Sequence, residues 1–162
     1  MTSVSSTPVD ADNASVVVSQ FLEKVKRGAG LEDLYDARDI AEVVFRTLRD
    51  MMTTELSDRI ASELEGKLLT TGDGASQDKL VEVWKDTNLL VRLLSRIRKP
   101  LIIETDTFLF RIGQEAGLSR GVTPEAATEA VFSALKSEIS AECQQEISKI
   151  LTSELRQAWH AA

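Results

Sequence analysis

The feature that most constrains the fold of this chain is an internal repeat. The segment that runs from Phe21 to Leu31 recurs from Phe108 to Leu118, 87 residues later (position 108 against position 21). The same offset, without a gap, pairs Glu42 with Glu129, Val44 with Val131, Phe45 with Phe132, Leu48 with Leu135, Ile60 with Ile147, and Leu64 with Leu151. A repeat at a fixed period indicates an architecture more directly than any single motif. Because most matched residues are apolar or suit helix ends, they indicate a duplicated folding unit rather than duplicated reactive groups.

Each copy is predicted to form three helices. The first helix carries an apolar stripe at i, i+3, i+4 and i+7 spacing, formed by Val18, Phe21, Leu22 and Val25. Gly30 and Gly117 stand where a helix ends in a left-handed residue, and the Leu that follows each can pack back on the last turn. The two glycines are therefore interpreted as helix caps and not as phosphate-binding residues.

The second and third helices also have paired start signals. The second helix is predicted to begin at Asp36 in the first copy and at Thr123-Pro124 in the second, where a hydroxyl cap precedes Pro. The third is predicted to begin at Thr53 and at Ser140. Its apolar residues recur every four positions: Leu56, Ile60, Leu64 and Leu68 in one copy, and Cys143, Ile147, Leu151, Leu155 and Trp159 in the other.

These patterns predict an all-α protein in which two tandem three-helix units form one helical bundle. The expected divisions are a disordered tail over residues 1–13, a first unit over 14–71, a loop over 72–79, a connecting helix over 80–99 and a second unit over 100–160. Apolar residues cover most of the circumference of the connecting helix, which predicts that it is buried among the others. The stretch Leu101-Ile102-Ile103 fits either an extended segment or an extra helical turn.

Composition restricts the classes of function. The chain has 162 residues and a net charge of −7, which argues against duplex nucleic acid as the main ligand. A single cysteine cannot form an intramolecular disulfide, and this suits a reducing compartment. No run of 18 apolar residues is present, and the N-terminal residues lack the basic and apolar regions of a signal peptide. We therefore expect a cytoplasmic protein without a transmembrane segment.

The order of motifs resembles a known family. A Phe-Leu helix ends in Ala-Gly-Leu, a second helix carries Val-Phe followed by Leu, and a third has Leu spaced by four; the residues are Phe21, Leu22, Gly30, Leu31, Val44, Phe45, Leu48 and Leu64 with their partners in the second copy. This pattern resembles the bacterial family called domain of unknown function 2267, over about Phe21 to Trp159. The resemblance implies tandem helical units and no known catalytic residues.

Candidate reactive residues are few. Cys143 would lie in the first turn of a helix, where backbone N–H groups can stabilise a thiolate, but its repeat partner is Leu56 and a position that accepts Leu is a core position. His160 is the only histidine and has no cluster of Cys or His around it. We therefore expect no catalytic site, no metal site and no cofactor, and we predict that the protein is not an enzyme.

A basic row is the main local departure from the acidic average. Lys85, Arg92, Arg96 and Lys99 fall on one face of the connecting helix. They are either the solvated side of that helix, paired with acids of the flanking units, or a docking strip for an acidic partner or an anionic surface. Trp84 and Phe110 join them as candidates for partner binding. Phe110 lies off the apolar stripe, where the first copy has Glu23, so it either packs against the connecting helix or is an exposed contact residue.

The sequence thus predicts a non-enzymatic helical interaction or regulatory protein. Its expected partner is a protein, and self-association into a homo-oligomer stays open. The alternative is a small-molecule-binding bundle, or an enzyme, with its site between the two repeats. A polar cavity between the two halves would favour the alternative, and a dry apolar junction would favour the interaction protein.

Overall fold

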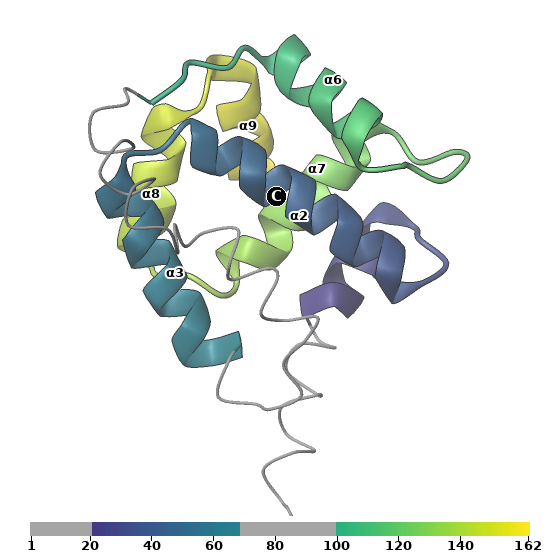
Figure 1. Ribbon diagram of the computed structural model, residues 1–162, viewed down its shortest axis with the longest axis horizontal. Helices are drawn as coiled ribbons and strands as arrows, with labels where there is room; N and C mark the ends of the chain where they lie inside the picture. The colour runs from purple at the N-terminus through teal and green to yellow at the C-terminus, as the bar shows by residue number, and fades with distance from the viewer. Residues whose placement is uncertain (1–20, 69–99) are drawn as a thin grey trace, which may run out of the picture.

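The computed structural model describes residues 21–68, of which 65–68 as backbone only, and residues 100–162 (Figure 1). Helix covers residues 21–29, and the elements that follow are α2 (Leu34–Asp50), α3 (Thr54–Leu68), α6 (Thr105–Glu115), α7 (Pro124–Lys136), α8 (Ala141–Ile150) and α9 (Ser153–Ala161). Every regular element in these two ranges is a helix, so the prediction of an all-α fold is confirmed. We refer to residues 21–68 as the first half and to residues 100–162 as the second half.

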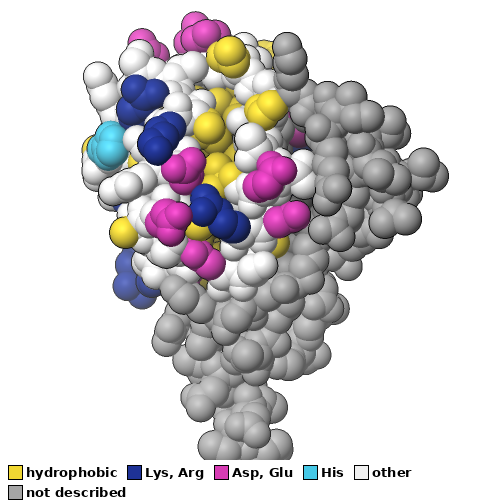
Figure 2. All heavy atoms as spheres, turned by 90° about the vertical axis from the view of Figure 1, so that its left-hand side faces the viewer, with side chains coloured by type: hydrophobic (Ala, Val, Ile, Leu, Met, Phe, Trp, Pro, Cys, Tyr) yellow, Lys and Arg dark blue, Asp and Glu magenta, His cyan; other side chains and the backbone are white. Residues whose placement is uncertain are grey.

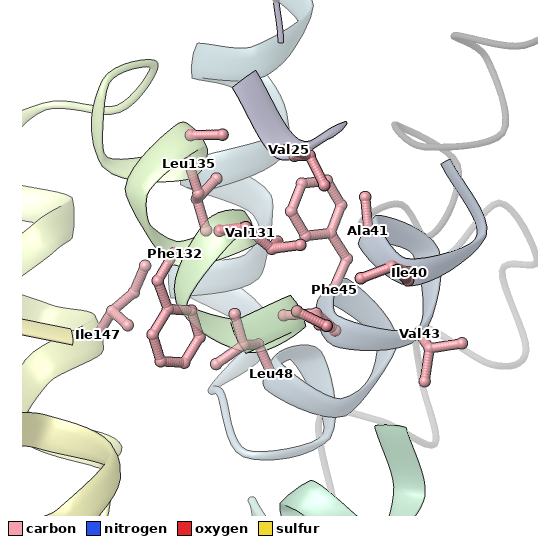
Figure 3. Close-up of a cluster of buried hydrophobic side chains, with 14 of the residues drawn as sticks. Val25, Ile40, Ala41, Val43, Phe45, Leu48, Val131, Phe132, Leu135 and Ile147 are labelled. Carbon is pink, nitrogen blue, oxygen red and sulfur yellow. The ribbon is translucent and has the colours of Figure 1, made fainter. Parts of the chain in front are cut away.

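The two halves meet in one apolar core. Helix α2 contacts both α6 and α7, and α3 contacts α8, so helices of one half pack directly on helices of the other (Figure 1). At the centre, Phe45 of α2 lies beside Val131 of α7, with Leu48 and Phe132 close by (Figure 3). All four side chains are fully buried. Burial of one such side chain contributes about 1.5–3 kcal/mol, so this junction is a main source of stability.

The helix ends at Gly30 and Gly117 have the predicted backbone conformation. Their φ angles are 69° and 59°, in the left-handed region that glycine adopts without strain. After Gly30, the N–H of Leu31 donates to the carbonyl of Lys26 at 2.9 Å, and the Leu31 side chain is buried. The interpretation of these glycines as helix caps is confirmed.

The helix starts agree with the sequence at three positions and differ at one. Thr53, Thr123 and Ser140 each accept a hydrogen bond at their side-chain oxygen from the backbone N–H three residues later. The prediction that α2 begins at Asp36 is wrong. Asp33 is the cap, because its backbone is extended and its carboxylate accepts from the N–H of Asp36 at 2.9 Å.

The last predicted helix is not continuous, which corrects the three-helix description of the second half. Helix α8 ends at Ile150, Leu151 has extended ψ (143°), and α9 begins at Ser153. The side chain of Arg156 holds this break. Its Nε donates to the carbonyl of Ser148 at 2.8 Å, and its Nη2 donates to the carbonyl of Leu151 at 2.9 Å. These carbonyls lack helical partners at the end of α8, and the guanidinium satisfies them.

The segment that leads into α6 is extended rather than helical. The N–H of Leu101 donates to the carbonyl of Asp50 at 2.9 Å, which ties this segment to the end of α2. Ile103 is buried, while Leu101 and Ile102 are exposed. The tail over 1–13, the loop over 72–79 and the connecting helix over 80–99 lie outside the described residues and stay predictions. None of the helices seen in the two described ranges has the length and apolar content needed to cross a membrane.

Candidate functional site

Only one of the residues predicted to bind a partner falls in the described part of the chain. Phe110 lies on α6 and is 66% exposed, which is unusual for a side chain of this size and hydrophobicity. The remaining candidates, Trp84, Lys85, Arg92, Arg96 and Lys99, lie outside the described residues. Phe110 is therefore the candidate whose surroundings the structure describes.

Phe110 borders a shallow hollow between α6 and the start of α7. The hollow has a volume of 390 Å³, and its described lining includes Asp106, Leu109, Pro124 and Glu125. Leu109 and Glu125 also line a second recess, so the two depressions adjoin. The exposed aromatic ring thus lines one of two neighbouring depressions.

The second recess lies between α6, α7 and α9 and has a volume of 240 Å³. Its apolar lining consists of Leu109, Leu155 and Ala158, which come from α6 and α9. Its polar lining consists of Thr105 and Thr128 together with the carboxylates of Glu125, Glu129 and Glu154. We call this depression the α6–α7–α9 recess. It combines apolar walls with an acidic rim.

The charge around the two depressions has one sign. Asp106, Glu125, Glu129 and Glu154 are exposed, and none of the described residues that line the depressions is Lys, Arg or His. Asp106, Glu125 and Glu154 stand in the first turns of their helices, where a carboxylate also stabilises the helix dipole. Glu129 lies beyond the first turn of α7 and has no such role. The surface around the two depressions is therefore negatively charged, and its apolar part consists of the walls of the α6–α7–α9 recess together with Phe110.

Thr128 is the anomalous residue of the α6–α7–α9 recess. It is 1% exposed, and its hydroxyl makes no hydrogen bond in the part of the chain that the structure describes. By contrast, the buried hydroxyl of Thr47 on α2 donates to the carbonyl of Val43 at 2.8 Å. An unsatisfied buried hydroxyl costs about 1–3 kcal/mol, so Thr128 is a polar group that lacks its partner.

A third depression, of 430 Å³, contains the only histidine. Ser148 and His160 are 3.0 Å apart through Oγ and Nε2, but no hydrogen bond or ion pair of the described residues joins a carboxylate to His160. Lys136 also lines this depression, and its ammonium group already donates to the carbonyls of Trp159 and Ala162. The lysine therefore holds the end of α9.

The face of the molecule over α3 and α8 carries charges of both signs. Acidic and basic side chains lie together there around apolar ones (Figure 2). Arg59 of α3 and Glu142 of α8 form an ion pair across it at 3.1 Å. This mixed face differs from the α6–α7–α9 recess, where the acids of the rim have no basic neighbour in the lining.

Cys143 is buried at the start of α8, as its repeat partner Leu56 predicts. Burial raises the pKa of the Cys143 thiol above its ordinary value, and the nearby carboxylate of Glu63 acts in the same direction. The hydroxyl of Ser140 acts in the opposite direction and is outweighed. The protonated thiol is therefore favoured, and Cys143 behaves as a small core residue.

The repeated glutamates, Glu42 and Glu129, have different surroundings. Glu42 on α2 accepts from Arg46 at 2.7 Å, while Glu129 lines the α6–α7–α9 recess. Within residues 21–68 and 100–162, no group of three His, Cys, Asp or Glu side chains comes together in a way that could hold a metal ion.

The class of the protein follows from this architecture: an all-helical protein in which residues 21–68 and 100–162 pack into one core. The chain belongs to the family described as "Uncharacterized conserved protein (DUF2267)", whose model matches residues 18–158. The resemblance noted in the sequence is thereby confirmed. Comparison with curated proteins finds no match.

Sequence reasoning did not find the α6–α7–α9 recess, although the repeat contains a signal for it. At the repeat offset, Glu125 replaces Arg38 and Thr128 replaces Ala41. Positions where two copies of one unit differ in charge or polarity are candidates for a role specific to one copy.

Proposed function

We propose that this protein is a non-enzymatic binding module that docks a basic, partly apolar segment of a partner protein. The docking surface is formed by α6, α7 and α9, with Phe110 as its apolar anchor. The observation that carries the proposal is the exposure of Phe110 beside two adjoining depressions whose charged lining residues are all acidic. Aromatic anchors next to hollows account for much of the binding energy in protein interfaces.

The charge of the surface argues for a basic partner. Opposite charges steer encounter and fix the orientation of two proteins, while an acidic partner would be repelled by the four carboxylates. The apolar walls of the α6–α7–α9 recess and Phe110 supply a contact that charge alone does not. A segment that carries Lys or Arg together with apolar residues satisfies both requirements.

The junction between the halves gives less support to the alternative of a ligand site there. Where described residues of the two halves meet, Val25, Phe45, Val131 and Leu135 are fully buried and apolar (Figure 3). Each of the three depressions is lined by described residues of the second half. These observations favour a surface interaction over chemistry in an interior site.

The test is site-specific photo-crosslinking in the native cell. A photoreactive phenylalanine analogue replaces Phe110 in one variant and Tyr35 in a matched control. Tyr35 is equally exposed, at 70%, but lies in the first half and has the cation of Arg38 over its ring. We expect the variant at position 110 to form an adduct with a basic segment of another protein, and the control at position 35 to miss it.

Charge reversal separates docking from non-specific adhesion. Glu129→Lys should abolish the adduct, whereas Glu42→Lys, its repeat counterpart on α2, should leave it intact with the same change in net charge. The adduct should also weaken as salt rises, because exposed charges are screened over about 8 Å at physiological ionic strength. An adduct with an acidic segment, an adduct with a second copy of this chain, or insensitivity to Glu129→Lys would each overturn the proposal.

A further inference from the structure

We infer that the α6–α7–α9 recess is a socket for one alkylammonium group, the side chain of a lysine from the docked partner. The inference rests on the proposed function and specifies which side chain of the partner enters the recess. Three properties of the recess carry it: its size, the division between apolar wall and acidic rim, and the unsatisfied hydroxyl of Thr128.

The size suits a single side chain. Pockets that enclose a cofactor or a drug-sized ligand measure roughly 300–1,000 Å³. At 240 Å³, the α6–α7–α9 recess is smaller than these, and it shares Leu109 and Glu125 with the hollow beside Phe110. It can accept a four-carbon chain from a segment that lies across α6 and α7.

The lining matches the two parts of a lysine side chain. Leu109, Leu155 and Ala158 offer apolar contact to methylene groups, while Glu125, Glu129 and Glu154 offer negative charge at the rim. Lysine commonly buries its aliphatic stem and keeps its ammonium group near polar surroundings. The carboxylates come from different helices, α7 and α9, which suits the three rotatable donors of an ammonium group more than the planar fork of arginine.

Thr128 is an observation independent of the charges. Its hydroxyl is buried and makes no hydrogen bond in the described part of the chain, and Thr128 is one of the residues that line the recess. A donor that reaches this hydroxyl from the recess would satisfy it. In the first half the matching residue is Ala41, which is buried and has no hydroxyl to satisfy. Leu22, which matches Leu109, is buried, whereas Leu109 is only partly buried and lines the recess. The polar socket is therefore a property of the second half alone.

The experiment is an NMR titration of the ¹⁵N-labelled full chain with n-butylammonium chloride at constant ionic strength. We expect saturable shifts in the millimolar range, confined to the backbone amides around Leu109, Thr128 and Leu155. n-Butanol tests for a merely apolar cavity, and n-propylguanidinium tests for a preference for arginine. Equal affinity for n-butanol or tighter binding of n-propylguanidinium would overturn the inference.

Two variants with matched controls test the assigned groups. Glu129→Gln should weaken n-butylammonium binding about threefold to fivefold, as expected for loss of one partly solvated charge pair, and Glu42→Gln should have no effect. Thr128→Ala should also weaken it, and because Ala41 occupies the matching position of α2, this variant is expected to fold. Unchanged affinity in both Glu129→Gln and Thr128→Ala would reject the socket.

The outcome is separable from that of the docking proposal. If n-butylammonium does not bind but the crosslink at position 110 still joins a basic segment, the socket is wrong and the docking surface stands. If n-butylammonium binds in the recess but no basic segment is crosslinked, the socket is real and the docking proposal fails, so that the ligand is a free amine.

Discussion

The two halves of the molecule share their core and differ at their surface. Phe21 and Phe45 pack with ring centroids 5.8 Å apart in the first half, and Phe108 and Phe132 do so at 6.2 Å in the second. All four rings are buried. Outside the core, the half-buried Arg38 of one half is replaced by the exposed Glu125 of the other. The comparison shows that packing restrains the buried positions of both copies, whereas a position at the edge of the core can change its charge.

The two halves also differ in the lengths of their helices, although both contribute buried apolar residues to the core. Helix α3 runs unbroken from Thr54 to Leu68, whereas the matching stretch of the second half is divided into α8 and α9. Leu151, Leu155 and Trp159 are nevertheless buried. A break of this kind reorients the last helix toward α7, which is how α9 comes to form one wall of the α6–α7–α9 recess.

The largest expected effect concerns the two central phenylalanines. Phe45→Ala and Phe132→Ala should each lower the free energy of unfolding by about 3–5 kcal/mol, because each leaves a cavity in a packed core. In the second half, the ring of Phe132 also packs edge-on against the ring of Trp159, with centroids 5.1 Å apart. Denaturant unfolding measures the loss of stability in each variant. A loss within about 0.5 kcal/mol, as for a surface substitution, would show that the substituted ring is not part of a packed core.

The next effect concerns the break between α8 and α9. Arg156→Ala should lower the free energy of unfolding by about 1–2 kcal/mol, because charge-assisted hydrogen bonds to the carbonyls of Ser148 and Leu151 are lost. Arg59→Ala is the control, since it removes only an exposed ion pair worth about 0–1 kcal/mol. If thermal unfolding shows equal losses of stability in the two variants, Arg156 does not stabilise the break between α8 and α9.

Two buried threonines, one in each half, give a smaller and sharper comparison. Thr47→Ala removes a hydroxyl that donates to the carbonyl of Val43, whereas Thr128→Ala removes one that makes no hydrogen bond with any described residue. Thr47→Ala should therefore be less stable than Thr128→Ala by about 1 kcal/mol. Equal free energies of unfolding would indicate that the Thr128 hydroxyl is satisfied in the free protein, for example by water.

The smallest expected effect is a pH dependence that arises from Cys143. Burial raises the pKa of this thiol, so the folded state binds the proton more tightly than the unfolded state. The stabilisation of the folded state that the protonated thiol provides is fully present below the ordinary thiol pKa, and it is lost as pH rises through the raised pKa. In unfolding experiments above pH 9, the Cys143→Ala variant should lack this alkaline loss.

The reactivity of Cys143 offers a second measurement. Free cysteine should react with a thiol reagent much faster than the folded protein at pH 8. Fast labelling of the native protein would contradict the equivalence of Cys143 and Leu56.

Much of the fold could be predicted from the sequence because its signals are local. The glycines at 30 and 117, the caps at Thr53, Thr123 and Ser140, and the buried apolar rows each depend on residues within a few positions of one another. The error at Asp36 had the same local character, since Asp33 and Asp36 are both acceptable caps and only the backbone conformation chooses between them.

The break at Leu151 and the recess could not be predicted in the same way. An i, i+4 apolar row through Cys143, Ile147, Leu151 and Leu155 is compatible with one straight helix, and the role of Arg156 depends on where the chain turns back. Likewise, nothing in the sequence shows that the hydroxyl of Thr128 lacks a partner, because satisfaction of a buried group depends on its neighbours in three dimensions.

The shared core affects which substitutions the two halves can accept during evolution. Either half alone would present the apolar face of α2 or α7 to water, and two separate chains would have to find each other at cellular concentrations. A covalent connection replaces that encounter with a high effective concentration and fixes the ratio of the halves at one to one. Neither half then has to recognise a copy of itself. The outer residues of the two halves therefore need not be identical. One half can carry Arg38 and the other Glu125 at matching positions of the repeat, and a single asymmetric surface can arise from a repeated sequence.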